Sequence, residues 1–146
     1  MIIRLFSSIM NSSVKYFIVG VLASEGFAYD PKKDIDLNDI AANYLENGGT
    51  FFVAFINGAI VGTCAVKKKS SEKCEIKRLY VHNDFRRMGV GSALLDKALK
   101  FATAHYKTAT LKTAASLEPA ITLYFKAGFS LIKEENGTVY LKTEFS

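Results

Sequence analysis

The residues best suited to chemistry form a basic glycine loop, Arg86-Arg87-Met88-Gly89-Val90-Gly91-Ser92. An apolar, strand-like run precedes this loop, and a helical periodicity follows it to about Tyr106. The N-terminus of a helix leaves backbone N–H groups unpaired and carries a partial positive charge, and glycines let an anion approach the backbone closely. The two arginines add donors that can fork onto phosphate oxygens. The loop is therefore predicted to bind an anion such as a phosphate.

Two other kinds of glycine loop are excluded by the spacing. A dinucleotide-binding fingerprint would require a third glycine at the position of Leu94. A P-loop would require glycine followed by lysine and then serine or threonine, and this triplet occurs nowhere in the chain. The loop is therefore neither a dinucleotide-binding fingerprint nor a P-loop.

The elements that position the loop begin with a strand and two helices. We expect a strand at residues 2–6 and a helix that ends near Ser24, with Ser12 or Ser13 as its N-cap. A second, short helix is expected to begin at Asp36 or Asn38 and to stop at an Asn-Gly-Gly sequence. Polar residues interrupt the apolar N-terminal stretch, so we interpret it as strand and helix and not as a secretion signal.

Three strands are predicted to follow as an antiparallel meander. Residues 50–56 and 59–66 are apolar runs joined by Asn57-Gly58, which is the strongest short-range signal for a β-hairpin. The third strand covers residues 74–81. We interpret Lys67-Lys68-Lys69 as a solvated turn between the second and third strands.

The C-terminal half alternates between helices and strands. A helix over residues 91–106 carries an apolar stripe that includes His105. A strand over 108–115 follows, and a right-handed crossover would set it parallel to the strand before the loop. The remaining expected elements are a helix from Pro119 to Gly128 and strands at residues 129–132 and 138–142.

Length and composition fit a single domain over residues 1–146. Hydrophobic residues make up 49% of the chain and charged residues 23%, which argues against disorder, and no apolar run reaches the roughly 18 residues of a membrane helix. The net charge of +5 would suit a nucleic acid, an anionic membrane surface or an anionic cofactor. No nucleic-acid-binding motif is present, so neither nucleic acid nor a membrane is expected as a partner.

The cysteines and histidines give no sign of a metal site or a disulfide. Cys64 and Cys74 lie on adjacent predicted strands, with neither a disulfide framework nor a metal-ligand spacing. We expect free, buried thiols, a cytoplasmic location and no bound metal. His82 at a strand end and His105 on a helix are interpreted as structural residues.

These features together resemble the GCN5-related N-acetyltransferase (GNAT) superfamily over most of the chain. The resemblance rests on the meander and on three sequence segments. They are the strand Glu75-Ile76-Lys77-Arg78-Leu79-Tyr80-Val81, the loop Arg86-x-x-Gly89-x-Gly91 and the run Leu123-Tyr124-x-Lys126-x-Gly128-Phe129. The loop alone is a weak pattern, but its place between strand and helix, with the last run about 32 residues further on, makes it specific.

The resemblance implies an α/β (α+β) fold. Its sheet would be mixed, mostly antiparallel and six- to seven-stranded, with a splayed parallel central pair and about four helices. In this superfamily acetyl-coenzyme A lies in the wedge where the two central strands splay. The resemblance implies that Leu79, Tyr80 and Val81 contact the pantetheine arm, mainly through the backbone. The residues implied to hold the pyrophosphate are Arg86, Arg87, Met88, Gly89, Val90, Gly91 and Ser92.

The implied activity is transfer of an acetyl group from acetyl-coenzyme A to a primary amine of a small molecule or peptide, by direct attack on the thioester. The amine must lose a proton, and Glu75 is the candidate base, directly or through water. Alternatively a water chain serves, and Glu75 is an exposed strand residue that balances Lys77 or Lys73. The carbonyl oxygen needs a donor, and a backbone N–H near residue 79 or 80 would supply it if the strand is irregular there.

The departing thiolate is the third requirement, and the resemblance assigns it to Tyr124. A phenol could protonate or hydrogen-bond the thiolate, so Tyr124 is also implied to contact the cofactor. The alternative interpretation of Tyr124 is an aromatic core residue. The superfamily often has an asparagine where this chain has Leu117, so one side-chain contact to the pantetheine arm is not expected. A non-catalytic acyl-coenzyme A-binding sensor or interaction domain of the same fold is therefore kept as an alternative function.

The acceptor-binding residues are the least defined. The resemblance places them partly in the loop after the first helix, around Phe27, Tyr29 and Asp30. The acidic residues Asp30, Asp34 and Asp36 would suit a cationic amine, and a solvated loop explains them equally well. A homodimer is left open.

Overall fold

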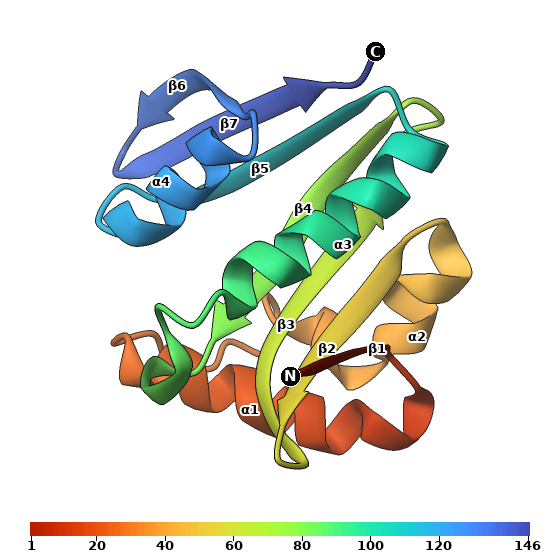
Figure 1. Ribbon diagram of the computed structural model, residues 1–146, viewed down its shortest axis with the longest axis vertical. Coiled ribbons are helices and arrows are strands. Elements are labelled where there is room, and N and C mark those ends of the chain that lie inside the picture. Colours follow the sequence, from red (N-terminus) through yellow and green to blue (C-terminus); the bar gives the residue numbers. More distant parts are fainter.

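A seven-stranded sheet runs through the molecule in the order β1-β2-β3-β4-β5-β7-β6 (Figure 1). The computed structural model describes residues 1–146. Every neighbouring pair of strands is antiparallel except β4 and β5, which are parallel. The mixed sheet with a parallel central pair confirms the predicted fold class. The strands are β1 (Ile2–Leu5), β2 (Thr50–Ile56), β3 (Ala59–Lys68), β4 (Lys73–Val81), β5 (Thr108–Ala114), β6 (Ser130–Glu135) and β7 (Thr138–Glu144).

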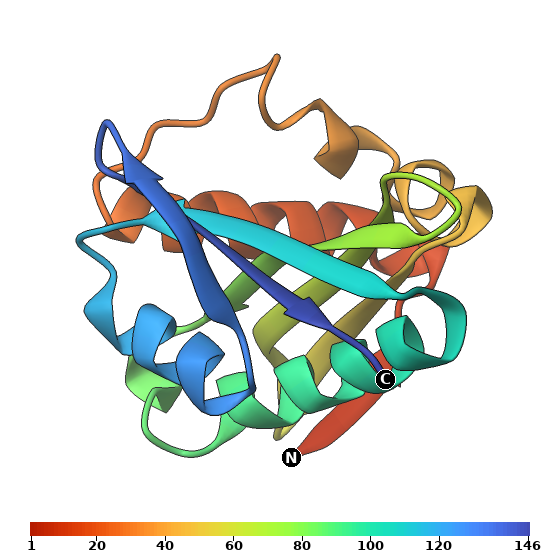
Figure 2. The ribbon, with the colours of Figure 1, turned by 90° about the horizontal axis from the view of Figure 1, so that it is seen from above.

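Helices cover the two faces of the sheet unequally (Figure 2). On one side α1 and α2 lie over the N-terminal half of the sheet, and on the other side lie α3 and α4. No helix is long and apolar enough to cross a membrane. The α-helices are α1 (Asn11–Ser24), α2 (Ile40–Asn43), α3 (Val90–His105) and α4 (Glu118–Lys126), and short 3-10 turns are η1 (Ser8–Met10), η2 (Ile35–Asn38), η3 (Leu45–Asn47) and η4 (Asn83–Phe85).

Each face has its own apolar core. The larger core joins α3 and α4 to the sheet, and Leu94 and Ala98 of α3 are fully buried in it. Gly62 permits this packing, because a Cβ atom there would stand 2.7 Å from Leu94 Cδ1. The smaller core joins α1 and α2 to β2 and β3, with Val14 and Phe51 fully buried. No residue of β5, β6 or β7 belongs to this smaller core.

The parallel pair β4 and β5 is joined over a short distance only. Their register runs from Lys73↔Thr108 to Glu75↔Thr110 and then ends. Beyond that point β5 continues to pair with β7 as far as Ala114, while β4 continues to pair with β3 as far as Val81. The two strands therefore diverge and leave a wedge, as the resemblance implied.

A β-bulge bends β4 beside this wedge. Thr63 of β3 faces Tyr80, whereas Ala65 faces Lys77, so β4 holds one more residue than β3 in this interval. Arg78 adopts a positive φ of 54° at the bulge, and the Thr63 hydroxyl donates a hydrogen bond to its carbonyl at 2.8 Å. The strand irregularity expected near residues 79 and 80 is thus present, with its centre one residue earlier.

The predicted helix caps were wrong in detail. Helix α1 begins at Asn11, directly after η1, so Ser12 and Ser13 lie inside the helix and no side chain caps it. Asn11 instead bonds across to the second helical region, where its side chain accepts from the Ile40 N–H at 3.0 Å. The cap of α2 is Asp39, which accepts from the Ala42 N–H at 3.1 Å.

Two further expectations about side chains need correction. Lys67 and Lys68 belong to β3, and the solvated turn starts at Lys69. His105 was expected on the apolar stripe of its helix, but it lies at the C-terminal end of α3 and is exposed. Its ring centre lies 4.4 Å from that of Phe101, with the two rings tilted.

Candidate active site

The glycine loop presents a row of free backbone donors. None of the N–H groups of residues 87–92 donates a hydrogen bond to another group of the chain, and the first helical bond of α3 runs from the Ala93 N–H to the Gly89 carbonyl at 3.0 Å. Arg87 and Gly89 have positive φ angles of 64° and 79°. Alternating handedness of this kind turns successive N–H groups toward one side, which is a geometry that binds anions.

The two loop arginines have different surroundings. Arg86 forms an ion pair with Glu25, at the end of α1, and its Nε donates to the Val81 carbonyl at 3.3 Å. Its side chain therefore ties the loop to α1. Arg87 is exposed and makes no hydrogen bond within the chain, so its guanidinium is the one available to a phosphate.

The residues predicted to contact a pantetheine arm line β4 where it leaves β5. Leu79 and Val81 are partly buried and pack against the α3-side core. Tyr80 packs against the opposite, α1-side core and accepts a hydrogen bond from Arg78 at 3.3 Å. Burial raises the pKa of Tyr80. Because the ladder to β5 has ended by this point, this edge of β4 is free to pair with an extended chain.

Tyr124 of α4 lies in the larger core with its hydroxyl unpartnered. The residue is 7% exposed and its ring packs edge-on against Phe129 at 6.0 Å. Its hydroxyl makes no hydrogen bond within the chain and reaches solvent, because every buried side-chain oxygen or nitrogen has a partner. Burial, with smaller contributions from Cys64 and Tyr80, raises the pKa of Tyr124 well above its ordinary value. A phenol of ordinary pKa is already protonated at neutral pH, and Tyr124 remains so here.

Glu75 occupies the last position at which β4 and β5 are paired. It is 8% exposed, so the alternative of an exposed strand glutamate is wrong. Its partner is neither Lys77 nor Lys73 but Lys69, whose Nζ lies 3.6 Å from Oε1. Cys74 and Ile76 on either side belong to the α3-side core, which places Glu75 on the other face of the sheet at the start of the wedge.

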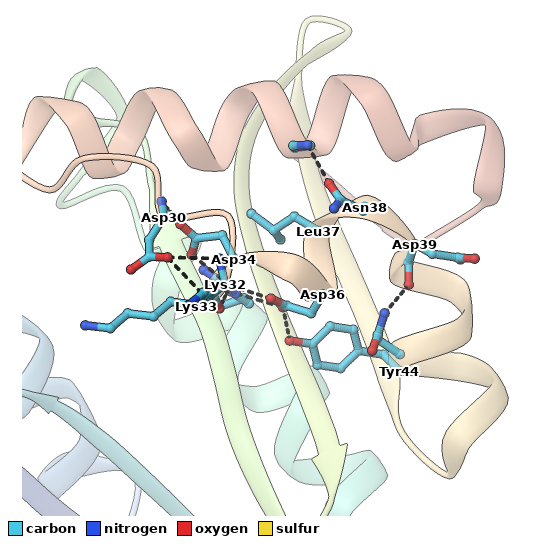
Figure 3. A network of polar contacts seen from close by, with 12 residues as sticks. Asp30, Lys32, Lys33, Asp34, Asp36, Leu37, Asn38, Asp39 and Tyr44 are labelled. Atoms are coloured by element: carbon cyan, nitrogen blue, oxygen red, sulfur yellow. Dashed lines mark hydrogen bonds and ion pairs between the residues drawn. The ribbon is translucent and has the colours of Figure 1, made fainter.

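Sequence reasoning missed a buried network at the bulge, part of which is shown in Figure 3. The Arg78 guanidinium bonds both oxygens of Asp36, at 2.6 and 3.0 Å, and Asp34 at 3.1 Å. The Tyr44 hydroxyl donates to Asp36 at 2.5 Å. Of the two interpretations left open for these acids, the solvated loop is wrong for Asp34 and Asp36, since both are buried and paired. No local sequence pattern signalled this network.

The residues predicted to contact an acceptor lie in the loop between α1 and η2. Phe27 and Tyr29 are exposed by 46% and 38%, and Lys15 Nζ lies 5.1 Å from the centre of the Tyr29 ring. Asp30 accepts hydrogen bonds from the N–H groups of Lys32 and Lys33, and these lower its pKa. The Asp30 carboxylate thus organises its own turn (Figure 3).

The remaining predicted residues have structural surroundings. Leu117 is the N-cap of α4 and offers no side-chain cap. His82 caps η4, where its Nδ1 accepts from the Asp84 N–H at 3.1 Å, so its structural role is confirmed. Cys64 and Cys74 are free and buried, and burial raises the pKa of both thiols, that of Cys64 to about 12 and that of Cys74 to about 11.

The groups around the wedge differ in what they offer a ligand. The loop has unpaired N–H groups that can donate to phosphates, and the edge of β4 beyond Glu75 has backbone groups that can pair with an amide-containing arm. Tyr124 and Glu75 come from opposite sides of the wedge. A carboxylate and a phenol are groups that can accept and donate protons.

Comparison with known proteins agrees with this geometry. Residues 9–129 match the model of the Acetyltransferase (GNAT) family. N-acetylaspartate synthetase from Xenopus tropicalis is 34% identical over 97 residues, which are 64% of this chain and 36% of that protein. N-acetyltransferase 8F1 from Rattus norvegicus is 34% identical over 100 residues, which are 64% of this chain and 45% of that protein. The chain spans about a third to a half of the length of these curated relatives.

Solved structures share the whole architecture. A GNAT-family acetyltransferase from Staphylococcus aureus Mu50 superposes with a TM-score of 0.89 at 23% identity, over 99% of both chains. The PaiA N-acetyltransferase from Thermoplasma acidophilum, solved in complex with coenzyme A, gives a TM-score of 0.78 at 15% identity, over 99% of this chain and 100% of that chain. With the family model covering most of its length, the chain belongs to the GNAT acetyltransferase family.

Proposed function

We propose that this protein transfers an acetyl group from acetyl-coenzyme A to a primary amine of a small molecule or peptide. The observation that carries the proposal is the row of free N–H groups at residues 87–92, placed at the open end of the β4–β5 wedge. An anion cradle that continues into a free strand edge suits a molecule with a pyrophosphate at one end and an amide-containing arm at the other.

The proposal assigns the cofactor to two groups of residues. The N–H groups of residues 87–92 and the Arg87 guanidinium would hold the pyrophosphate. The backbone of Leu79, Tyr80 and Val81 would hold the arm. Bound there, acetyl-coenzyme A supplies an activated acyl group as a thioester. Arg86 would act on the loop through Glu25 and Val81, and not on the phosphates.

Two side chains of this protein would handle protons. Glu75, buried at the start of the wedge, would accept the proton of the attacking amine, directly or through water. Tyr124, whose free hydroxyl is held protonated by its surroundings, would donate to the departing sulfur. The bulge at Arg78 bends the backbone of the following residues, and an N–H there would stabilise the carbonyl oxygen as it becomes anionic.

The named relatives support amine acetylation. They include N-acetylaspartate synthetases and N-acetyltransferases, and a structural neighbour from Elizabethkingia anophelis has acetyl-coenzyme A bound.

A cytoplasmic location is part of the proposal and is supported by the free thiols of Cys64 and Cys74. A homodimer is a separate hypothesis, which light scattering on the purified protein tests directly.

A thiol-release assay over a panel of amines tests the proposal. Purified protein with acetyl-coenzyme A is expected to release coenzyme A faster when a suitable amine is present, and mass spectrometry should find the amine 42 Da heavier, the mass of an added acetyl group less the proton it replaces. Calorimetry with acetyl-coenzyme A is the companion measurement. Tight binding with no turnover on amino acids, polyamines or peptides would instead support the non-catalytic acyl-coenzyme A sensor.

A further inference from the structure

One face of the C-terminal half-sheet is open and carries lysines. On β5 and β7, Leu111, Val139 and Leu141 point into the α3-side core, so the alternating residues Lys112 and Tyr140 point to the opposite face. The α1-side core contains nothing from β5, β6 or β7, so these residues lie beyond the cover of α1 and α2. An acceptor approaching the wedge from this face meets them first.

The strand register places two of the lysines on either side of the wedge. Glu75 and Thr110 form the last residue pair between β4 and β5. The next residues on the same face are Lys77 on β4 and Lys112 on β5, and the strands have separated between them. These two lysines, which we call the mouth lysines, therefore flank the point at which an acceptor would reach the thioester.

The mouth lysines have no partner, although other lysines near them do. Lys69 pairs with Glu75 at 3.6 Å, Lys133 with Glu135 at 2.9 Å and Lys142 with Glu144 at 3.5 Å. Lys77 and Lys112 form neither an ion pair nor a hydrogen bond, and Lys77 is half-buried. Leaving a half-buried ammonium unpaired is costly, so this position fits a cation whose counter-ion arrives with a ligand.

Nearby charges give no substitute for that counter-ion. Burial lowers the pKa of Lys77, while Glu75 and Asp36 favour its charged form. Asp36, however, is already bonded by Arg78 and Tyr44, and Glu75 lies near Lys69. The acidic residues that would have suited a cationic acceptor are thus occupied, and the free charge at the wedge mouth is positive.

We propose that the acceptor is an amine that also carries a carboxylate, such as an amino acid, and that Lys77 and Lys112 bind this carboxylate. The proposal rests on the proposed acetyl transfer and names the substrate class of that same site. With the carboxylate on the mouth lysines, the amine of such a molecule can reach the wedge beside Glu75. A polyamine in the same place would put like charges next to each other.

Steady-state kinetics with charge-neutral variants tests the assignment. The probes are L-aspartate, L-glutamate and L-alanine, with L-alaninamide and putrescine as amines that lack a carboxylate. In wild type the carboxylate-bearing amines should be preferred. Lys77→Gln is expected to lower kcat/KM for them by about 10- to 100-fold, chiefly through KM, and Lys112→Gln by somewhat less, because a charged hydrogen bond is lost. The amines without carboxylate should change little.

Lys97→Gln is the matched control, because Lys97 is exposed on the outer face of α3 and is expected to leave all substrates unaffected. Binding of N-acetyl-L-aspartate to the coenzyme A-loaded protein, followed by calorimetry, gives a readout that does not depend on turnover and should weaken in Lys77→Gln. Preference for putrescine, or an equal loss for all amines in Lys77→Gln, would overturn the carboxylate assignment while leaving acetyl transfer intact. Absence of turnover on every amine, with acetyl-coenzyme A bound, would instead overturn the proposed function.

Discussion

Two polar regions lie on opposite sides of β4, and they differ in how completely their groups are paired. At the bulge, the Arg78 guanidinium donates to the carboxylates of Asp34 and Asp36, and the Tyr44 hydroxyl donates to Asp36. On the wedge side, the N–H groups of residues 87–92 and the Tyr124 hydroxyl bond to nothing in the chain. Buried polar groups are normally paired, and those at the bulge follow this rule. The unpaired groups on the wedge side reach solvent and are therefore open to a ligand.

Two arginines with similar backbones make the same point. Arg78 and Arg87 both have positive φ angles, 54° and 64°, which an L-residue adopts only when its surroundings require it. At Arg78 the surrounding carboxylates provide that requirement. At Arg87 the side chain is exposed and unbonded, so the conformation serves the orientation of the loop backbone.

The largest effect should come from breaking the paired region. Arg78→Ala leaves the carboxylates of Asp34 and Asp36 buried without their cation, and we expect it to lower the free energy of unfolding by about 3–5 kcal/mol. Urea denaturation measures this loss. Arg87→Ala is the control and should stay within about 0.5 kcal/mol of wild type. Equal destabilisation by both substitutions would remove the distinction between the two regions.

Removing the free hydroxyl of the wedge should affect chemistry and leave stability almost unchanged. Tyr124→Phe keeps the buried ring and deletes the proton donor, so we expect kcat to fall about 100-fold while the Kd for acetyl-coenzyme A changes by less than about threefold. Turnover and calorimetry on the same preparation provide the two numbers. If turnover is unchanged, Tyr124 is only the aromatic core residue of the alternative interpretation.

A smaller effect is expected on cofactor binding, where substitutions of the two loop arginines should differ in the affinity that they remove. Arg87→Ala removes a free guanidinium and is expected to weaken acetyl-coenzyme A binding about 10-fold, more steeply at low salt. Arg86→Ala removes the tie to Glu25 and should weaken binding less, by about threefold at most. A larger loss for Arg86→Ala than for Arg87→Ala would show that the ion pair with Glu25 opens when the cofactor binds.

The smallest effect should be a change with pH in the stability that Asp36 gives to the folded protein. Burial opposes the charged form of Asp36, but hydrogen bonds from Arg78 and Tyr44 outweigh it and lower its pKa below the ordinary 3.8. The Asp36 carboxylate thus binds a proton less readily in the folded state than in the unfolded state. The stability that it contributes is fully present above the ordinary pKa of 3.8 and is lost as the pH falls through the lowered pKa of the folded state. Asp36→Asn should be less stable than wild type at pH 6, with the difference narrowing below pH 4. A constant difference would contradict the lowered pKa.

The sequence predicted the free N–H groups of the loop better than the paired network at the bulge, for a physical reason. Free donors at a helix start depend on local features, namely glycines and the onset of a helical period, which are visible in the chain itself. The same holds for the hairpin at Asn57-Gly58. The bulge network joins Asp36 to Arg78, which lies 42 residues further on, and no local pattern connects them. Loop acids that pair with a distant arginine look the same in sequence as solvated ones.

The same limit applies to the candidate site. The motifs singled out Tyr124 and residues 86–92 as site residues, which stays a prediction, and they gave no sign that Arg86 pairs with Glu25. Neither did they single out Lys77, because its importance depends on the end of pairing at Glu75↔Thr110 and on the helices that leave β5 uncovered. Such information arises only when strands from separate parts of the chain come into register.

The short parallel ladder between β4 and β5 also affects local opening of the folded protein. Only the pairs from Lys73↔Thr108 to Glu75↔Thr110 join the two halves of the sheet edge to edge, so β5, α4, β6 and β7 form a natural unit of local opening. A ligand in the wedge binds the closed form alone and would raise the free energy of that opening by about 2.7 kcal/mol at 100 times its Kd. Amide exchange along β5 would then slow as the concentration of acetyl-coenzyme A rises. The exchange rate would therefore report how much acyl donor is available.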